Sequence, residues 1–352
     1  MSENSSSVLT PEQVAKVCPF YKDGYLILPG FIPKDETAAL LSRAKQLIAE
    51  FSLEGHPMTR FTTGEEDDPT QSKKHVGDEY FLASGDKIRF FLEDDAFDAQ
   101  GNLVKPKEKS VNKIGHGEQL ARDLAFHQDP EEIGGKVPEH NDSTFLYTDP
   151  PSALGFWFAL EPCTEFNGAL SFLAGSHRST PINKRFVRLP EGGTGFTNIE
   201  TPITPLDLQN QPSERSTNTS TAEGDYVLET CDAGTLVLIH GSVLHKSERN
   251  TSQNTRFAYT FHMIESAPKA RYDERNWLQP TETMPFSKLY GTQASHACSG
   301  LFDFRSLKKE LAVIRVFAWK DVRSFDLIYT ICTMAALCDV LSTASSSAVP
   351  YH

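Results

Sequence analysis

The stretch from Gly134 to Thr148 contains a His-x-Asp triplet, His140-Asn141-Asp142, shortly after two glycines and a proline. In a strand, residues two apart point to the same face, about 6.5–7 Å apart along the backbone. An imidazole and a carboxylate can then bind one ion together, with a third ligand from elsewhere in the chain. His245 is the candidate. Two histidines and one carboxylate on one face of an octahedral metal leave open positions, as in non-haem Fe(II) oxygenases.

A His-x-Asp triplet alone is weak evidence, because it arises easily by chance, and the residues that follow strengthen it. Residues 235–240 form an apolar run typical of a strand and lead to His245. Arg256 follows and begins a second strand-like run, residues 256–264. A metal site that uses a dicarboxylate cosubstrate needs a fixed cation for the distal carboxylate. The planar, permanently charged guanidinium of arginine suits this task.

Other histidines compete for the metal. His240 and His245 are an odd number of positions apart, so a continuous strand would point them to opposite faces. His127-Gln128-Asp129 is a second His-x-Asp triplet, but Pro130 and acidic residues follow it instead of a strand, which makes it the weaker pair.

Two further histidines are expected to be structural. His262 has the same parity as Arg256 but lies about 20 Å further along an extended strand. His177 follows Gly175-Ser176 and is expected in a turn.

Composition and charge exclude several classes of function. The 352 residues, 39% of them hydrophobic, allow one large or two small domains with an ample core. A net charge of −13 argues against general binding to nucleic acid or anionic membranes. Six scattered cysteines without a C-x-x-C motif and a polar N-terminus indicate reduced thiols and no secretory signal. We expect a cytoplasmic monomer with a small-molecule substrate.

The coarse pattern predicts several elements. Residues 21–31 predict a turn and then a strand, and residues 33–51 predict a helix because apolar residues recur there every three or four positions. Residues 80–91 predict strand, turn and strand, and residues 118–125 one or two helical turns. Residues 189–229 are rich in Gly, Thr, Ser and Asn and predict a long loop.

Several of these segments together resemble the phytanoyl-CoA dioxygenase family over about residues 10 to 290. The segments that carry the resemblance are residues 84–91, 134–150, 154–157, 167–177, 245–256 and 276–280. The resemblance implies a mainly β protein with flanking helices, built as a double-stranded β-helix, or cupin-like jelly roll. It also implies Fe(II), 2-oxoglutarate and O₂.

The resemblance further implies roles for individual residues. It matches His140, Asp142 and His245 to the iron ligands, and Arg256 to the arginine that binds 2-oxoglutarate. Resemblance to one branch of the family implies further cosubstrate contacts from Lys113, Trp157 and Ser247. We also assign Asn141, within the His-x-Asp triplet, to the cosubstrate site. From the residues alone these have plainer readings: Lys113 as a surface lysine, Trp157 as core and Ser247 as a turn cap.

The implied activity is hydroxylation of an unidentified small organic substrate, with 2-oxoglutarate converted to succinate and CO₂. The family name suggests an acyl-CoA, but no basic cluster for the CoA phosphates is evident in the sequence. A zinc hydrolase with the same triad is another reading. Arg256 argues against it, because such an enzyme needs no clamp for a distal carboxylate.

The segment before the His-x-Asp triplet departs from the family pattern. Only 24 residues separate His116 from His140, and the hydrophobic strand expected just before Gly134-Gly135 is missing. Loss of a central strand would expose unpaired backbone groups on its neighbours. The alternative function is therefore a catalytically impaired or non-catalytic barrel that binds a metal or a partner.

The tail is the second departure. We assign residues 1–290 to the dioxygenase domain and residues 291–352 to a divergent tail of unknown role. Residues 306–319 show a weak helical pattern. The apolar residues 326–341 are fewer than the roughly 20 that a membrane-spanning helix needs, so we expect no membrane span.

Overall fold

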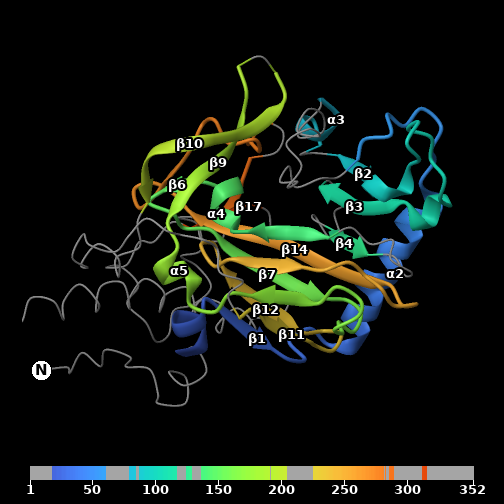
Figure 1. Cartoon of the computed structure of the whole chain (residues 1–352), viewed down its shortest axis with the longest axis horizontal. Helices are drawn as coiled ribbons and strands as arrows, with labels where there is room; N and C mark the ends of the chain where they lie inside the picture. Colours follow the sequence, from blue (N-terminus) through green and yellow to red (C-terminus); the bar gives the residue numbers. More distant parts are fainter. Residues whose placement is uncertain are drawn as a thin grey trace, which may run out of the picture.

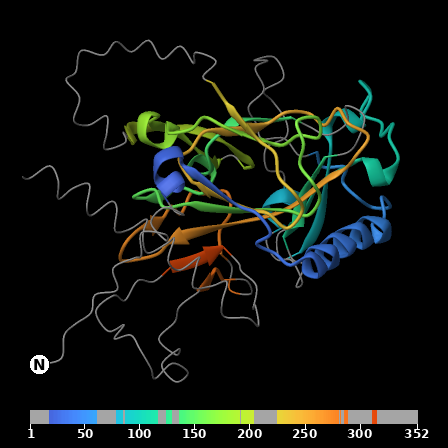
Figure 2. The ribbon, with the colours of Figure 1, turned by 90° about the horizontal axis from the view of Figure 1, so that it is seen from below.

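The structure, a computed structural model, consists mainly of antiparallel β-sheet with few helices (Figures 1 and 2). It describes residues 18–60, 79–84, 87–116, 124–128, 136–190, 192–203, 225–280, 282, 285–288 and 311–314. The predicted tail segment 326–341 and residues 118–123 lie outside these ranges. Among the described residues, no helix has the length and apolar character needed to cross a membrane.

The larger sheet crosses the whole molecule. Its main path is β1 (Tyr25–Leu28), β12 (Leu236–His240), β7 (Leu154–Ala159), β14 (Arg256–Glu265), β4 (Leu124–Gln128), β3 (Val111–His116) and β2 (Ile88–Leu92). Two short strands, β16 (Ser287–Lys288) and β17 (Leu311–Ile314), join it beside β14. The neighbours in this order are far apart in the sequence, so the sheet is assembled by non-local pairing.

The smaller sheet packs against the larger one. It contains β11 (Val227–Glu229), β8 (Leu170–Phe172), β13 (His245–Ser247) and β5 (Val137–His140), in that order. One buried cluster joins the two sheets: Trp157, Val237 and Ala258 from the larger sheet pack with Leu170 and Phe172 from the smaller one. Two antiparallel sheets closed over a shared interior form a double-stranded β-helix, as expected.

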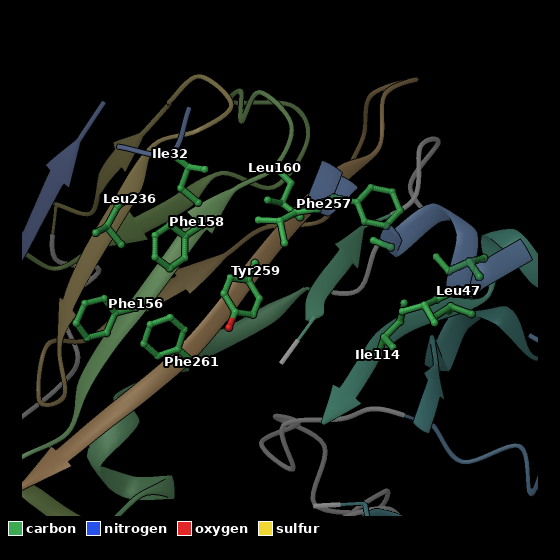
Figure 3. Close-up of a cluster of buried hydrophobic side chains, with 14 of the residues drawn as sticks. Ile32, Leu47, Ile114, Phe156, Phe158, Leu160, Leu236, Phe257, Tyr259 and Phe261 are labelled. Carbon is green, nitrogen blue, oxygen red and sulfur yellow. The ribbon is translucent and has the colours of Figure 1, made fainter. Parts of the chain in front are cut away.

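Helix α2 (Lys34–Glu50) covers the outer face of the larger sheet. Its apolar residues recur every three or four positions, which directs Leu40, Ala44 and Leu47 to one side of the helix. They join a second cluster with the outward-facing aromatic residues of β7 and β14, among them Phe158 and Tyr259 (Figure 3). The predicted helix over residues 33–51 and the predicted strand within residues 21–31 are thus confirmed.

The remaining elements lie at the edges of the barrel. The hairpin of β9 (Ile182–Arg188) and β10 (Thr194–Ile203) projects from one end (Figure 1), and β6 (Thr148–Asp149) pairs with β15 (Arg271–Tyr272). The short helices are α3 (Glu79–Leu82), α4 (Asp142–Phe145), α5 (Ser176–Ser179), and the 3₁₀ turns η1 (Asp94–Ala96) and η2 (Lys107–Lys109).

Some predictions about local structure were wrong. The expected first strand of residues 80–91 is instead the helical turn α3, where Phe81 stacks on Trp277 with ring centroids 4.6 Å apart. The expected loop over residues 189–229 contains strand β10, because Gly192 and Gly193 adopt positive φ and close a hairpin onto β9. In both places, long-range contacts outweighed local composition.

The place of the expected missing strand is occupied. β4 lies between β14 and β3, and it pairs Gln128 with Arg256 and Leu124 with Tyr259. The helical turns predicted for residues 118–125 therefore give way to strand by Leu124. The far half of β14 pairs with β17, which lies in the segment where a weak helical pattern was read. Backbone groups along β14 thus find partners that the short connection did not suggest.

Candidate metal centre

The smaller sheet brings the two candidate histidine ligands together. His140 is the last residue of β5 and His245 the first of β13, and they are direct partners in the register of these strands. Their ring centroids lie 4.2 Å apart. Asp142 follows just beyond β5 as the first residue of α4. The intervening Asn141 has an extended backbone, with φ −125° and ψ 147°. Side chains therefore continue to alternate between the two faces just beyond the end of β5, and the Asp142 side chain lies on the same face as that of His140.

Backbone carbonyls orient both imidazole rings. The Nδ1 atom of His140 lies 2.8 Å from the carbonyl oxygen of Pro138, and Nδ1 of His245 lies 3.1 Å from that of Val243. A carbonyl only accepts, so each Nδ1 carries the proton and each Nε2 keeps a free lone pair. Fixing the tautomer in this way is typical of histidines that bind metals.

The free ring nitrogens face one carboxylate oxygen. Nε2 of His140 lies 3.9 Å and Nε2 of His245 3.8 Å from Oδ1 of Asp142. The three ligand atoms all lie within 4.8 Å of one another. Atoms bound to one transition-metal ion at about 2.0–2.2 Å are separated by about 3–4 Å, so the residues fit a shared ion. The proposed third ligand, His245, therefore meets the His-x-Asp pair.

The site favours the unprotonated ligands that a metal requires. Burial, together with the neighbouring His245, lowers the pKa of His140 to about 4. Burial alone would raise the pKa of Asp142, but His262, His245 and His140 together hold it well below its usual value. At neutral pH the structure thus presents a neutral imidazole at His140 and an ionised carboxylate at Asp142, and neither has to lose a proton before a cation binds.

Arg256 lies inside the barrel at the start of β14. It is 1% exposed, and its Nε and Nη1 atoms have no hydrogen-bond partner among the described residues. Burial lowers its pKa, although an arginine stays charged. Trp157 of β7 faces it, with Cζ of Arg256 5.7 Å from the ring centre. A buried guanidinium with unsatisfied donors fits an anion such as a carboxylate.

Register places Lys113 on the same face of the sheet as Arg256. Arg256 is paired with Gln128 and Lys113 with Phe126, and residues 126 and 128 share a face of β4. Lys113 is partly buried. The structure thus brings the two predicted cosubstrate cations to one wall of the barrel, two strands apart.

The other two predicted cosubstrate contacts, Asn141 and Ser247, make structural contacts within the protein. Asn141 caps α4: its Oδ1 accepts from the backbone N–H and the hydroxyl of Thr144, each at 3.0 Å. Ser247 is buried on β13 opposite Leu170 of β8. Their contact with a cosubstrate stays a prediction.

The fold places three of the competing histidines, His240, His177 and His127, on different elements. His240 packs against His177, with ring centroids 4.8 Å apart, and is not one of the three residues whose ligand atoms converge. His177 itself lies in the short helix α5. His127 belongs to strand β4, for which the structure describes the backbone alone. Asp129 lies outside the described residues.

His262 is a correction to the sequence analysis. It was expected to be structural and remote, yet its Nε2 lies 3.2 Å from Oδ2 of Asp142. The estimate of about 20 Å along the strand holds only relative to Arg256. A long distance from Arg256 does not imply a long distance from the metal ligands. The even spacing between Arg256 and His262 was the signal in the sequence that both side chains face the interior.

The comparisons with known proteins agree with this site. The phytanoyl-CoA dioxygenase (PhyH) family model matches residues 20–258. Phytanoyl-CoA dioxygenase domain-containing protein 1 of Bos taurus is 39% identical over 313 residues, covering 80% of this chain and 99% of that protein. Its Caenorhabditis elegans homolog is 34% identical over 305 residues, covering 77% and 97%.

A solved structure of EctD from S. alaskensis, with 2-oxoglutarate and 5-hydroxyectoine, is 19% identical and has a TM-score of 0.37. That match covers 74% of this chain and 78% of the EctD chain. The residues that the family model matches include His140, Asp142 and His245. The chain therefore belongs to the phytanoyl-CoA dioxygenase family.

Proposed function

We propose that the chain is an Fe(II)- and 2-oxoglutarate-dependent dioxygenase that hydroxylates a small organic substrate and releases succinate and CO₂. The observation that carries the proposal is the convergence of His140, Asp142 and His245. Their ligand atoms all lie within 4.8 Å of one another, and the Nδ1 contacts with backbone carbonyls leave both Nε2 atoms unprotonated. Two histidines and one carboxylate leave coordination positions open for cosubstrate and O₂. Family membership supports the same chemistry.

The electrostatics of the interior support 2-oxoglutarate as the cosubstrate. Two donor atoms of buried Arg256 have no hydrogen-bond partner within the described part of the chain, and burying a charge with unsatisfied donors destabilises a fold. A dicarboxylate supplies the missing anion. Lys113, on the same wall of the barrel, adds a second positive charge. A zinc hydrolase with the same three ligands would have no use for either cation.

The residues of the chain then have distinct tasks. His140, Asp142 and His245 would hold the iron, which when bound supplies the one-electron chemistry needed to react with O₂. Arg256 would hold the distal carboxylate of 2-oxoglutarate through charge-assisted hydrogen bonds from its guanidinium. Trp157 walls the guanidinium on one side and keeps water from it. The buried cluster between the sheets keeps the interior dry, which strengthens both charge interactions.

Succinate formation tests the proposal directly. The purified full chain is incubated with Fe(II), ascorbate and 2-oxoglutarate, and succinate is measured over time beside His140→Ala. We expect succinate from the unaltered chain even without a primary substrate, through uncoupled turnover, and background alone from His140→Ala. His240→Asn is the matched control, because His240 ends β12 of the larger sheet and packs against His177 instead of joining the three converging residues.

The rival function is a barrel that binds a metal or partner without turnover. The short connection between β3 and β5 favours it, because β4 pairs with only the first part of β14. Equal background from the unaltered chain and His140→Ala, with both proteins folded, would support the rival and overturn the dioxygenase proposal.

A further inference from the structure

His262 occupies a position that the metal triad does not account for. It lies on β14, on the inward face shared with Arg256, and its register partner on β7 is Gly155. Its side chain is 24% exposed, and its Nε2 lies 3.2 Å from Oδ2 of Asp142. This separation suits a charge-assisted hydrogen bond, although Oδ2 makes no hydrogen bond to the described residues in the structure. Hydrogen bonds at such sites often tighten only when the site is filled.

The two oxygens of Asp142 face different partners. Oδ1 faces the free Nε2 atoms of His140 and His245, at 3.9 and 3.8 Å. Oδ2 is buried and faces His262. His262 is not among the residues whose ligand atoms all lie within 4.8 Å of one another. The geometry therefore separates one metal-facing oxygen from one oxygen turned toward a ring that is not a ligand.

Gly155 makes room for this contact. A Cβ at residue 155 would lie 3.0 Å from Oδ2 of Asp142 and 3.4 Å from Nε2 of His262. It would also lie 3.2 Å from Cβ of Ile239 on the opposite neighbouring strand. A side chain at residue 155 would crowd the Asp142 carboxylate, and Ile239 on β12 would leave it no room to move away. Gly155 thus supplies the space in which Asp142 and His262 meet.

We propose that His262 is a positioning residue: it donates its Nε2–H to Oδ2 of Asp142 and so leaves Oδ1 alone to bind the metal. The donor tautomer of His262 is the opposite of that in His140 and His245, whose protons lie on Nδ1. With Oδ2 engaged, Asp142 binds through one oxygen, and the second oxygen does not compete for positions that cosubstrate and O₂ need. The inference rests on the proposed metal-dependent function and adds a residue to it.

Metal affinity tests this without turnover. Co(II) is titrated into the metal-free full chain by calorimetry and by its visible absorption spectrum. His262→Leu, which removes the donor at similar size, should weaken Co(II) binding about 10- to 100-fold and change the spectrum, as expected for loss of a partner of a metal ligand. His262→Gln, whose amide N–H reaches a similar point, should restore most of the affinity. Thr260→Val, on the same face of β14, is the matched control and should bind as the unaltered chain does.

Gly155→Ala provides a second, independent perturbation if His262→Leu does not fold. Its added methyl should displace the carboxylate and weaken Co(II) binding. Unchanged affinity and spectrum in His262→Leu, or equal losses in His262→Leu and His262→Gln, would overturn the hydrogen-bond role. Failure of the unaltered chain itself to bind Co(II) would instead refute the proposed metal site, so the two failures are distinguishable.

Discussion

The guanidinium of Arg256 lies over the ring of Trp157, with Cζ 5.7 Å from the ring centre, on adjacent strands of the larger sheet. A cation over an indole face gains about 0.5–2 kcal/mol. Desolvating a charge in a protein interior costs several kcal/mol. Trp157 therefore offsets only part of the burial of Arg256. The uncompensated part of this cost favours the binding of an anion beside Arg256.

This imbalance predicts opposite effects of Arg256→Met on stability and on binding. The metal-free variant should be as stable as the unaltered chain or more stable, by about 1–3 kcal/mol. In the variant, an apolar side chain of similar volume replaces a buried guanidinium with two donor atoms that lack hydrogen-bond partners among the described residues. Its affinity for 2-oxoglutarate, measured by calorimetry on the Co(II)-loaded chain, should fall at least about 100-fold, since the buried cation that pairs with the distal carboxylate is lost. A destabilised variant with normal 2-oxoglutarate affinity would show that Arg256 is structural.

Lys113 should make a smaller contribution to the same binding step. Register places it on the same face as Arg256, two strands away, and a more distant cation has a weaker pull on the carboxylate. Lys113→Met should raise the KM for 2-oxoglutarate about tenfold with little change in kcat, equivalent to about 1.4 kcal/mol of uniform binding. Lys113→Arg keeps the charge and is the control. No change in KM in Lys113→Met would remove this residue from the cosubstrate site.

Asn141 allows a capping role to be separated from a cosubstrate role. Its Oδ1 accepts two hydrogen bonds from Thr144 at the start of α4. Asn141→Ala should lower the free energy of unfolding by about 0.5–2 kcal/mol, whereas Asn141→Ser keeps a capping oxygen and should be nearly neutral. If the amide also touches 2-oxoglutarate, as the sequence predicts, Asn141→Ser should raise the KM for 2-oxoglutarate several-fold. A normal KM in a stable Asn141→Ser would leave capping as the role.

The sequence predicted the ligand set because metal chemistry restricts residue types more tightly than packing does. His140, Asp142 and His245 stand out by identity, spacing and family resemblance, and the register of β5 and β13 then brings them together. His262 was missed because its partner, Oδ2 of Asp142, lies across a strand that only the fold places there. From the sequence, Gly155 was included only as part of a motif. Its role became visible in the structure, where Oδ2 of Asp142 and Nε2 of His262 occupy the space that a side chain would need.

Elements that depend on distant partners were also the ones read wrongly. Nothing local in residues 80–82 marks the helical turn whose Phe81 stacks on Trp277. Likewise, β4 is set by the backbone groups that β14 and β3 offer it, and a short connection in the sequence suggested that no strand was present. Helix α2, by contrast, carries its whole signal in its own apolar spacing.

His240 predicts a loss of stability in mild acid. Burial, with His177 beside it, lowers the pKa of His240 to about 3, although the charge of Asp142 acts in the opposite direction. The unfolded chain takes up a proton near pH 6.5, so between about pH 3 and 6.5 the unfolded state binds a proton that the folded state does not. The folded state therefore loses stability as pH falls below 6.5, by about 1.4 kcal/mol per pH unit from this residue.

His240→Asn isolates this contribution. The asparagine Oδ1 can accept the N–H of Ser242 that Nδ1 of His240 now accepts at 3.1 Å, but the side chain does not titrate. Between pH 7 and pH 5, urea unfolding of the metal-free chain should show a loss of stability about 2 kcal/mol smaller in the variant. The comparison between the two proteins cancels the similar loss from His140, whose pKa is lowered to about 4. Parallel pH profiles would mean that His240 is protonated in the folded chain and that water or an anion reaches the His177–His240 pair.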